Sequence, residues 1–105
     1  MSETLDPSWT WWTGRYTFEL TWRPGITVEI DVSVRRDDAI IWWGNRTLAV
    51  IDRVLLREWL FHPREPLNRD DLVWSVEHGV TCLTIFSSTP CAVPSHAVAY
   101  LTAVI

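Results

Sequence analysis

Lysine is absent from this chain of 105 residues, and its nine positive charges are all arginine. Thirteen acidic residues leave a net charge of −4. A protein that binds duplex DNA usually carries a basic stripe on one face. Scattered arginine in an acidic chain instead suits paired contacts with carboxylates. The composition therefore favours contacts with protein over bulk attraction to phosphate.

Long apolar runs are also absent, and no segment approaches the roughly 18–20 residues that a membrane helix needs. Residues 1–10 contain neither a basic start nor an apolar stretch, so they do not resemble a signal peptide. The two cysteines, Cys82 and Cys91, are then expected to be reduced thiols in a cytoplasmic protein. The length fits one domain, residues 1–105, without internal repeats.

Motifs of catalysis are missing as well. Four scattered glycines cannot build a phosphate-binding loop, and no Gly-x-Ser-x-Gly elbow occurs. The acidic pairs Asp37-Asp38 and Asp70-Asp71 lie in predicted turns, where aspartate is favoured for local hydrogen bonding. We therefore expect no catalytic residue, no cofactor and no enzymatic activity.

One spacing is reminiscent of a zinc site, with His78 and Cys82 followed by Cys91 and His96. If Val80–Phe86 is a strand, His78 and Cys82 lie about 13 Å apart at roughly 3.3 Å per residue. Ligands of one zinc ion must converge within about 4 Å. The sequence therefore predicts no metal site, with Cys82 as a small buried hydrophobic residue.

Alternation of apolar and polar residues predicts most of the fold. Arg15–Trp22 and Ile26–Val34 form a hairpin around Arg23-Pro24-Gly25. The pattern assigns to the core Tyr16, Phe18, Leu20 and Trp22 of the first strand and Ile26, Val28, Ile30, Val32 and Val34 of the second. Further strands are expected at Ala39–Trp43, Thr47–Ile51, Leu72–Glu77 and Val80–Phe86.

A helical stripe of Leu55, Leu56, Trp59 and Leu60 predicts a helix over Asp52–Leu60, capped by Asp52 and ended before Pro63. The three leucines are expected to pack against the first sheet. Arg64–Asp71 and Ser87–Pro94 are expected to be loops. Ser95–Ile105 fits a helix with Ser95 as its N-cap, and strand alternation fits almost as well.

The predicted fold is α+β, mainly antiparallel, with about six or seven strands. It has an arm at 1–14, a core at 15–90 and a tail or helix at 91–105.

Tryptophan is unusually frequent, with eight residues. Aromatic residues favour strands, so many of them belong to the core. Adjacent residues in a strand point to opposite faces, however. At least one member of each pair Trp11/Trp12 and Trp42/Trp43 must therefore face a second layer, a subunit or solvent. We expect these four residues to form an oligomer or partner interface, with Trp43 preferred and capping of its own core as the alternative.

From the helix onward the chain resembles a known family. The segment Arg53–Leu60 is followed by Pro63, then by Asp71-Leu72-Val73-Trp74, Gly79-Val80 and Phe86-Ser87-Ser88-Thr89-Pro90. This series is similar to the SsgA-like sporulation and cell-division proteins of actinobacteria. Trp59 stands where the family usually has glycine, the loop from Pro63 to Asp71 is longer, and Asp37-Asp38-Ala39 shortens a segment before the third strand.

The resemblance implies a compact fold similar to the Whirly domains, assembly into trimers and no enzymatic activity. It also implies recruitment to division septa and contacts with division proteins such as the tubulin-like FtsZ or other family members. Two other functions stay open. A single-stranded nucleic-acid-binding protein is suggested by the Whirly-like fold and by the tryptophans, since bases stack on aromatic rings. A small immunity or phage-encoded inhibitor is the other.

Overall fold

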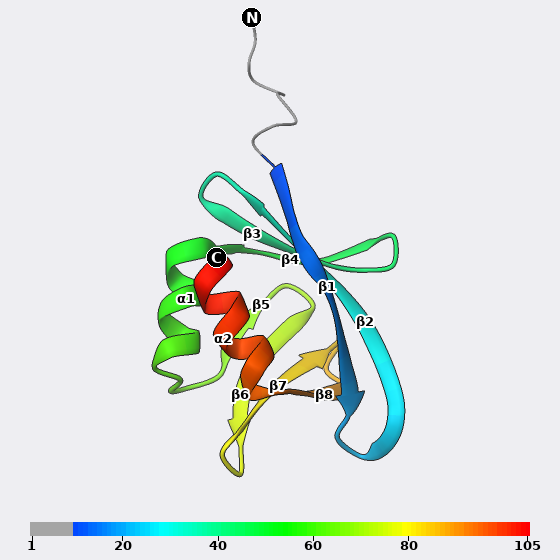
Figure 1. Cartoon of the computed structure of the whole chain (residues 1–105). Coiled ribbons are helices and arrows are strands. Elements are labelled where there is room, and N and C mark those ends of the chain that lie inside the picture. Colours follow the sequence, from blue (N-terminus) through cyan, green and yellow to red (C-terminus); the bar gives the residue numbers. More distant parts are fainter. Residues whose placement is uncertain (1–9) are drawn as a thin grey trace, which may run out of the picture.

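The computed structural model describes the backbone of residues 10–105 and the side chains of residues 12–105. The chain forms four strands, a helix, four more strands and a second helix (Figure 1). The elements are β1 (Thr10–Leu20), β2 (Arg23–Arg35), β3 (Asp38–Trp43), β4 (Arg46–Asp52), α1 (Arg53–Phe61), β5 (Leu67–Arg69), β6 (Leu72–Glu77), β7 (Val80–Ile85), β8 (Thr89–Val93) and α2 (Ser95–Val104). Neither helix has the length and apolar character needed to cross a membrane.

The β1–β2 hairpin follows the predicted alternation over most of its length. Phe18, Leu20 and the valines and isoleucines from Val28 to Val34 are buried. Trp22 and Ile26 are 61% and 45% exposed, so their assignment to the core is wrong. The hairpin turn is Thr21-Trp22 and not the predicted Arg23-Pro24-Gly25, and Ile26 lies where the register between β1 and β2 is irregular. Strand β1 also begins at Thr10, five residues before the expected start, because Thr10–Trp12 pair with Ser33–Arg35 of β2.

Helix α1 begins as predicted. The Asp52 side chain accepts a hydrogen bond from the Leu55 amide at 3.0 Å, and the helix ends at Phe61, two residues before Pro63. Leu56, Trp59 and Leu60 are buried, and the helix packs against β3, β4 and α2. The prediction for Leu55 was wrong, since this side chain lies off the buried stripe and is 38% exposed.

Eight strands are present in the described residues, two of them in segments predicted as loops. Strand β5 is three residues long and has no alternation of its own, so its pairing with β6 defines it. Strand β8 contains Pro90, whose carbonyl accepts a hydrogen bond from the Thr21 amide at 3.0 Å. The Pro90 nitrogen faces the same side as its carbonyl, towards β1. The lack of an N–H therefore costs no hydrogen bond to β7, and the ladder between β8 and β7 is intact.

The C-terminal segment is a helix, one of the two structures that its sequence fits. Its N-cap is Pro94 and not the predicted Ser95, and no side chain caps it. Ala97, Leu101 and Ile105 are buried. These three positions are four residues apart and therefore share one face.

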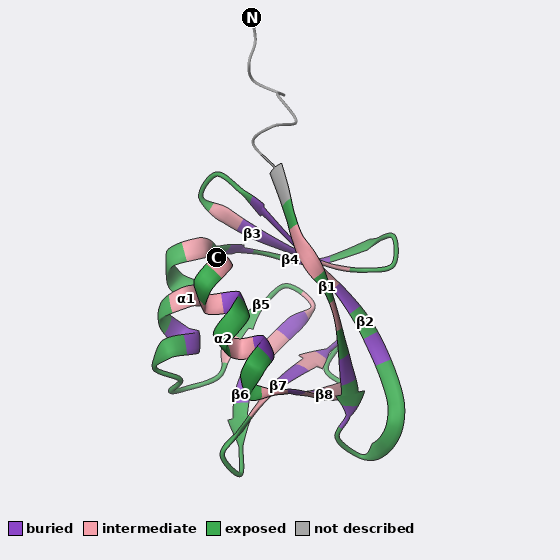
Figure 2. Ribbon diagram, viewed as in Figure 1, coloured by how far each residue is buried: buried purple, intermediate pink, exposed green. Residues whose placement is uncertain are grey.

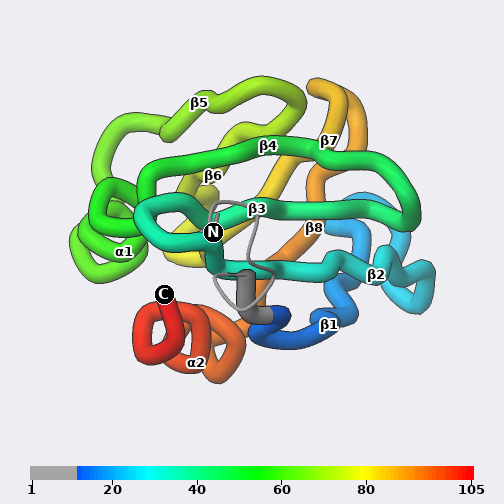
Figure 3. Tube along the Cα trace, turned by 90° about the horizontal axis from the view of Figure 1, so that it is seen from above, coloured from blue at the N-terminus to red at the C-terminus, as the bar shows by residue number. Residues whose placement is uncertain are grey.

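The strands form one antiparallel sheet in the order β4-β3-β2-β1-β8-β7-β6-β5, curved into a nearly closed barrel (Figure 3). The turn Asp70-Asp71 joins its two ends, because the Asp71 amide donates to the Leu48 carbonyl at 3.0 Å and the Val50 amide donates to the Asp70 carboxylate at 3.3 Å. Strands β1 and β8 meet only at Glu19–Ala92 and Leu20–Cys91. Helix α2 lies beside β1 where these two strands diverge (Figure 3).

The core lies between the inner faces of the strands and the buried sides of both helices (Figure 2). The Trp59 and Trp74 rings are 6.3 Å apart within it, and the Trp59 indole donates to the Glu65 carbonyl at 2.8 Å. Each half of the chain therefore supplies four strands and one helix to a shared core, although the sequence shows no internal repeat.

Candidate functional site

The outer face of β1–β4 carries a row of apolar side chains. Strand register aligns Trp12 of β1 with Ser33 of β2, Ile40 of β3 and Val50 of β4. Ile40 is only 8% exposed and Ser33 only 7%, although both lie on the face that points away from the barrel core. Their neighbours in the sheet shield them, and Trp12 itself is 63% exposed. This set, with Trp42, is called the outer aromatic face below.

A charged network supports Trp12. The Arg15 guanidinium donates two hydrogen bonds to the Asp31 carboxylate, at 2.8 and 3.3 Å, and lies 3.9 Å from Glu29. The hydrogen bonds from Arg15, its charge and a hydrogen bond from Trp12 hold the pKa of Asp31 below its usual value. Asp31 is also the register partner of Trp42. Asp31 therefore lies between Trp12 of β1 and Trp42 of β3 on the same face of the sheet.

The two members of the Trp42/Trp43 pair have different surroundings. Trp42 is partly buried on the outer face. The Trp43 ring lies 5.9 Å from the Phe86 ring in the turn between β7 and β8, and it is 36% exposed. Arg46 stacks over Phe86 at 4.8 Å. Trp43 thus packs against a turn of its own chain and stays partly exposed. The Trp11 side chain lies outside the described residues.

The histidines and cysteines do not form a metal site in the described part of the chain. Cys82 pairs with Ala92 while Cys91 pairs with Leu83, so the register places the two thiols on opposite faces of the sheet. Both are buried, and burial raises the pKa of Cys82 and raises that of Cys91 to about 11. Among residues 10–105, no three histidine, cysteine or acidic side chains are arranged to hold an ion.

In the acidic pairs, Asp37, Asp70 and Asp71 occupy turns as predicted, whereas Asp38 is already in a strand. Asp37 lies in the β2–β3 turn and Asp38 begins β3. Asp70 has a positive φ of 52° and bonds to β4, and the Asp71 carbonyl accepts a hydrogen bond from the Phe86 amide at 2.9 Å. Both residues of the second pair therefore close the barrel.

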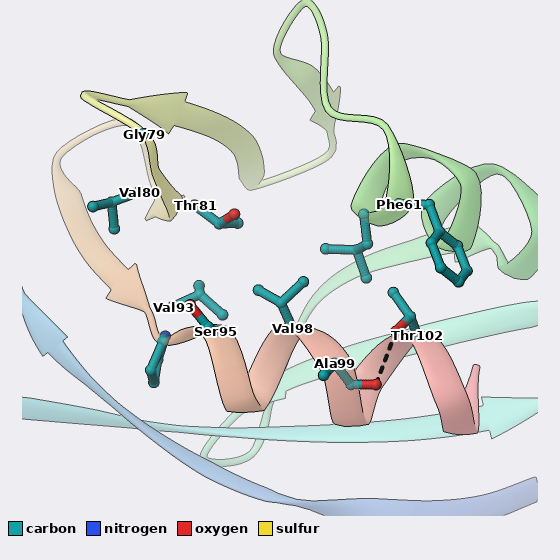
Figure 4. Close-up of a pocket in the computed structure, with 11 residues that line it drawn as sticks. Phe61, Gly79, Val80, Thr81, Val93, Ser95, Val98, Ala99 and Thr102 are labelled. Atoms are coloured by element: carbon teal, nitrogen blue, oxygen red, sulfur yellow. Dashed lines mark hydrogen bonds between the residues drawn. The ribbon is translucent and has the colours of Figure 1, made fainter.

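A neutral groove of about 530 Å³ lies between the end of α1, the β6–β7 hairpin and α2 (Figure 4). Phe61 borders it and is 62% exposed, while Val98, Ala99 and Thr102 form the side contributed by α2. The Thr102 hydroxyl donates to the Ala99 carbonyl at 2.8 Å, so this hydroxyl is engaged within the helix. None of the eleven lining residues carries a charge.

A second groove of about 540 Å³ lies on the other side of α2, against β1. Its ring-bearing residues are Tyr16, Phe18 and Tyr100, with Arg15 and His96 at its polar positions. The Tyr16 ring is 6.2 Å from Phe18 and 6.1 Å from Tyr100. Burial raises the pKa of Tyr16. Both grooves depend on the position of α2 relative to the sheet. The spacing of apolar residues in the sequence predicts strands and helices, but it does not predict that position.

The sequence singles out Trp12 and Trp42 but not the residues between them. Ile40 and Val50 fall within the expected strands Ala39–Trp43 and Thr47–Ile51, without an assignment to a face. The pairing of β2 with β3 and of β3 with β4 places Ile40 and Val50 on the same face as Ser33. Once the register is known, the alternation of β2 fixes the face that each paired residue occupies. Comparison of the chain with protein-family models, with curated proteins and with solved structures yields no match.

Proposed function

We propose that the protein is a non-enzymatic adaptor that forms homo-oligomers and binds other proteins. The observation that carries this proposal is the outer aromatic face. Its indole at position 12 is 63% exposed and lies beside the Arg15–Asp31 pair. Tryptophan is enriched where interfaces gain most of their energy. Contact between subunits is the commonest way to cover such a patch.

Two exposed tryptophans allow a matched test. Trp12 and Trp22 are 63% and 61% exposed, but only Trp12 belongs to the outer aromatic face. By light scattering at high micromolar concentration, the wild type is expected to exceed its chain mass of 12.2 kDa. Trp12→Ala should shift the population towards monomer, since loss of a central aromatic anchor costs about 2 kcal/mol or more.

Trp22→Ala is the control and should leave the measured mass unchanged. Trp43→Ala should also leave it unchanged while lowering stability, because Trp43 packs on Phe86 of its own chain. A wild type that runs as a monomer at high concentration would remove the oligomer from the proposal. Equal decreases in the measured mass for Trp12→Ala and Trp22→Ala would show that the outer aromatic face is not the subunit interface.

The role in division rests on the resemblance to the SsgA-like proteins. The order of four strands, a helix, more strands and a final helix is consistent with that resemblance. The motif residues that carry it are largely structural here: Leu56 and Trp74 are 1% and 2% exposed. These buried residues are therefore evidence about the fold and not about which partner the protein binds.

The division role has its own test. The protein is expected to sediment with FtsZ polymerised in the presence of GTP, and to stay in the supernatant when GTP is omitted. Absence from the pellet under both conditions would contradict an FtsZ-directed role while leaving the oligomer test unaffected.

A further inference from the structure

Strand β1 has a long free edge. It contains eleven residues, but its pairing with β8 is confined to Glu19 and Leu20. On that side, no strand of the described chain pairs with residues 10–18. Unpaired backbone groups at a strand edge are ready partners for another extended chain.

The register shows which backbone groups face the gap. The Thr21 amide donates to the Pro90 carbonyl at 3.0 Å, so Thr21 presents its backbone to β8. Successive residues of a strand direct their N–H and C=O groups to alternate sides. The pairing with β2 is regular from Arg15 to Glu19, so Arg15 and Thr17 also face the β8 side. Strand β8 has diverged at that level, and within residues 10–105 these two residues have no backbone partner on that side.

The second groove lies along this edge. It is lined on the strand side by residues 15–18 and on the helix side by Pro94, His96, Ala97 and Tyr100. Tyr16 and Tyr100 give it an aromatic surface, with Phe18 buried beneath them, and Tyr100 is half exposed. Its volume of about 540 Å³ is adequate for several residues of an extended chain with inward-pointing apolar side chains.

The charges along the groove select its ligand. No acidic residue belongs to its lining, and of the two basic residues there Arg15 is already paired with Asp31 and Glu29, so His96 is the basic residue left to meet a carboxylate. The N-terminal end of α2 borders the groove at Pro94 and has no side-chain cap, so its partial positive charge is not neutralised locally. A carboxylate of the incoming chain would therefore be attracted to the His96 end.

We propose that this groove binds an extended segment of a partner protein, with apolar residues and at least one carboxylate, by adding it as a strand to β1. Backbone hydrogen bonds to Arg15 and Thr17 supply affinity, and the aromatic surface and the His96 end supply specificity. A single extended segment suits the groove better than the β1 edge of a second copy, because that edge is flanked by its own α2. The site is separate from the outer aromatic face and does not rest on oligomerisation.

The test uses linear twelve-residue peptides selected from a random phage-displayed library on wild-type protein. Thr17→Pro removes one edge N–H, and proline is tolerated on edge strands. Synthetic copies of the selected peptides should alternate apolar and polar residues and carry a carboxylate. Their affinity is expected to fall about tenfold for Thr17→Pro, which corresponds to one lost hydrogen bond. Thr17→Ala keeps the N–H and should bind within about twofold of the wild type.

Two further measurements do not depend on the folding of the proline variant. His96→Glu should weaken the same peptides by about fivefold or more through charge repulsion. Hydrogen exchange at the Arg15 and Thr17 amides of the wild type should slow when peptide is bound. The proposal is wrong if no peptide is enriched, if peptides bind Thr17→Pro as tightly as Thr17→Ala, or if exchange at these amides is unchanged. Salt-dependent binding of an oligothymidylate that displaces the peptides would assign the groove to single-stranded nucleic acid instead.

Discussion

Leu56→Ala is expected to lower the free energy of unfolding by about 2–5 kcal/mol, the range for large-to-small substitutions in a core. Leu56 is 1% exposed and lies on the side of α1 that packs against β3, β4 and α2. The substitution removes apolar surface from the core and leaves a cavity between a helix and a curved sheet, which cannot collapse easily around it. Urea denaturation followed by tryptophan fluorescence would measure the change.

The neighbouring residue is a matched control. Leu55 belongs to the same helix, has the same side chain and is 38% exposed. Leu55→Ala should cost less than about 1 kcal/mol, because alanine is the better helix former and little core volume is lost. A loss below about 0.5 kcal/mol for Leu56→Ala, or equal losses for both variants, would show that α1 is not docked as described.

Arg53 should have the second largest effect, because it connects three parts of the chain. Its guanidinium donates to the Ile105 carbonyl at 3.0 and 2.7 Å and to the Arg36 carbonyl at 2.6 Å. Its own amide donates to the Asp37 carbonyl at 2.8 Å. The side chain thereby ties the start of α1 to the β2–β3 turn and to the residue that follows α2.

Arg53→Met keeps most of the aliphatic stem and removes all three guanidinium bonds. We expect a loss of about 1.5–3 kcal/mol, the usual contribution of a hydrogen bond that involves a charged group. The partial burial of these bonds limits their replacement by water. Hydrogen exchange should accelerate at the C-terminal amides of α2 before it does so in β6 or β7.

Arg57→Met provides the comparison, since Arg57 lies one turn further along α1 and makes no side-chain hydrogen bond to the described residues. Its effect should be within about 0.5 kcal/mol. If Arg53→Met proves equally neutral, the connection between the two helices must come from apolar packing alone.

Local patterns were sufficient where a segment is half-buried and regular. The alternation in β2 identified Val28, Ile30, Val32 and Val34 as core residues, and all four are buried. Strand β6 has the predicted bounds, Leu72–Glu77, because the turns at each end carry strong local signals. Asp52 caps α1 as expected because N-capping is a local interaction between a side chain and an amide three residues later.

Local patterns failed where pairing partners decide the structure. Strand β5 has no alternation, and β8 carries a proline that usually marks a loop. Both become strands because β6, β7 and the end of β1 offer them backbone partners. The β5–β6 and β7–β8 pairings are tight hairpins, but neither β5 nor β8 shows the alternation by which a strand is recognised. The pairing of β8 with β1 joins segments about 70 residues apart, so a short window around residues 89–93 contains no record of it.

The sequence by itself determined the α+β class, the strands of the first hairpin, the first helix and the need for at least one indole of each adjacent pair to leave the core. These features follow from side-chain periodicity and local hydrogen bonding. Only the tertiary structure decided that Trp12 shares a row with Ile40 and Val50, that Trp43 packs on Phe86, and that β1 and β8 diverge beside α2. Register, curvature and strand divergence result from packing between segments far apart in the chain. Both proposed binding surfaces depend on these long-range features.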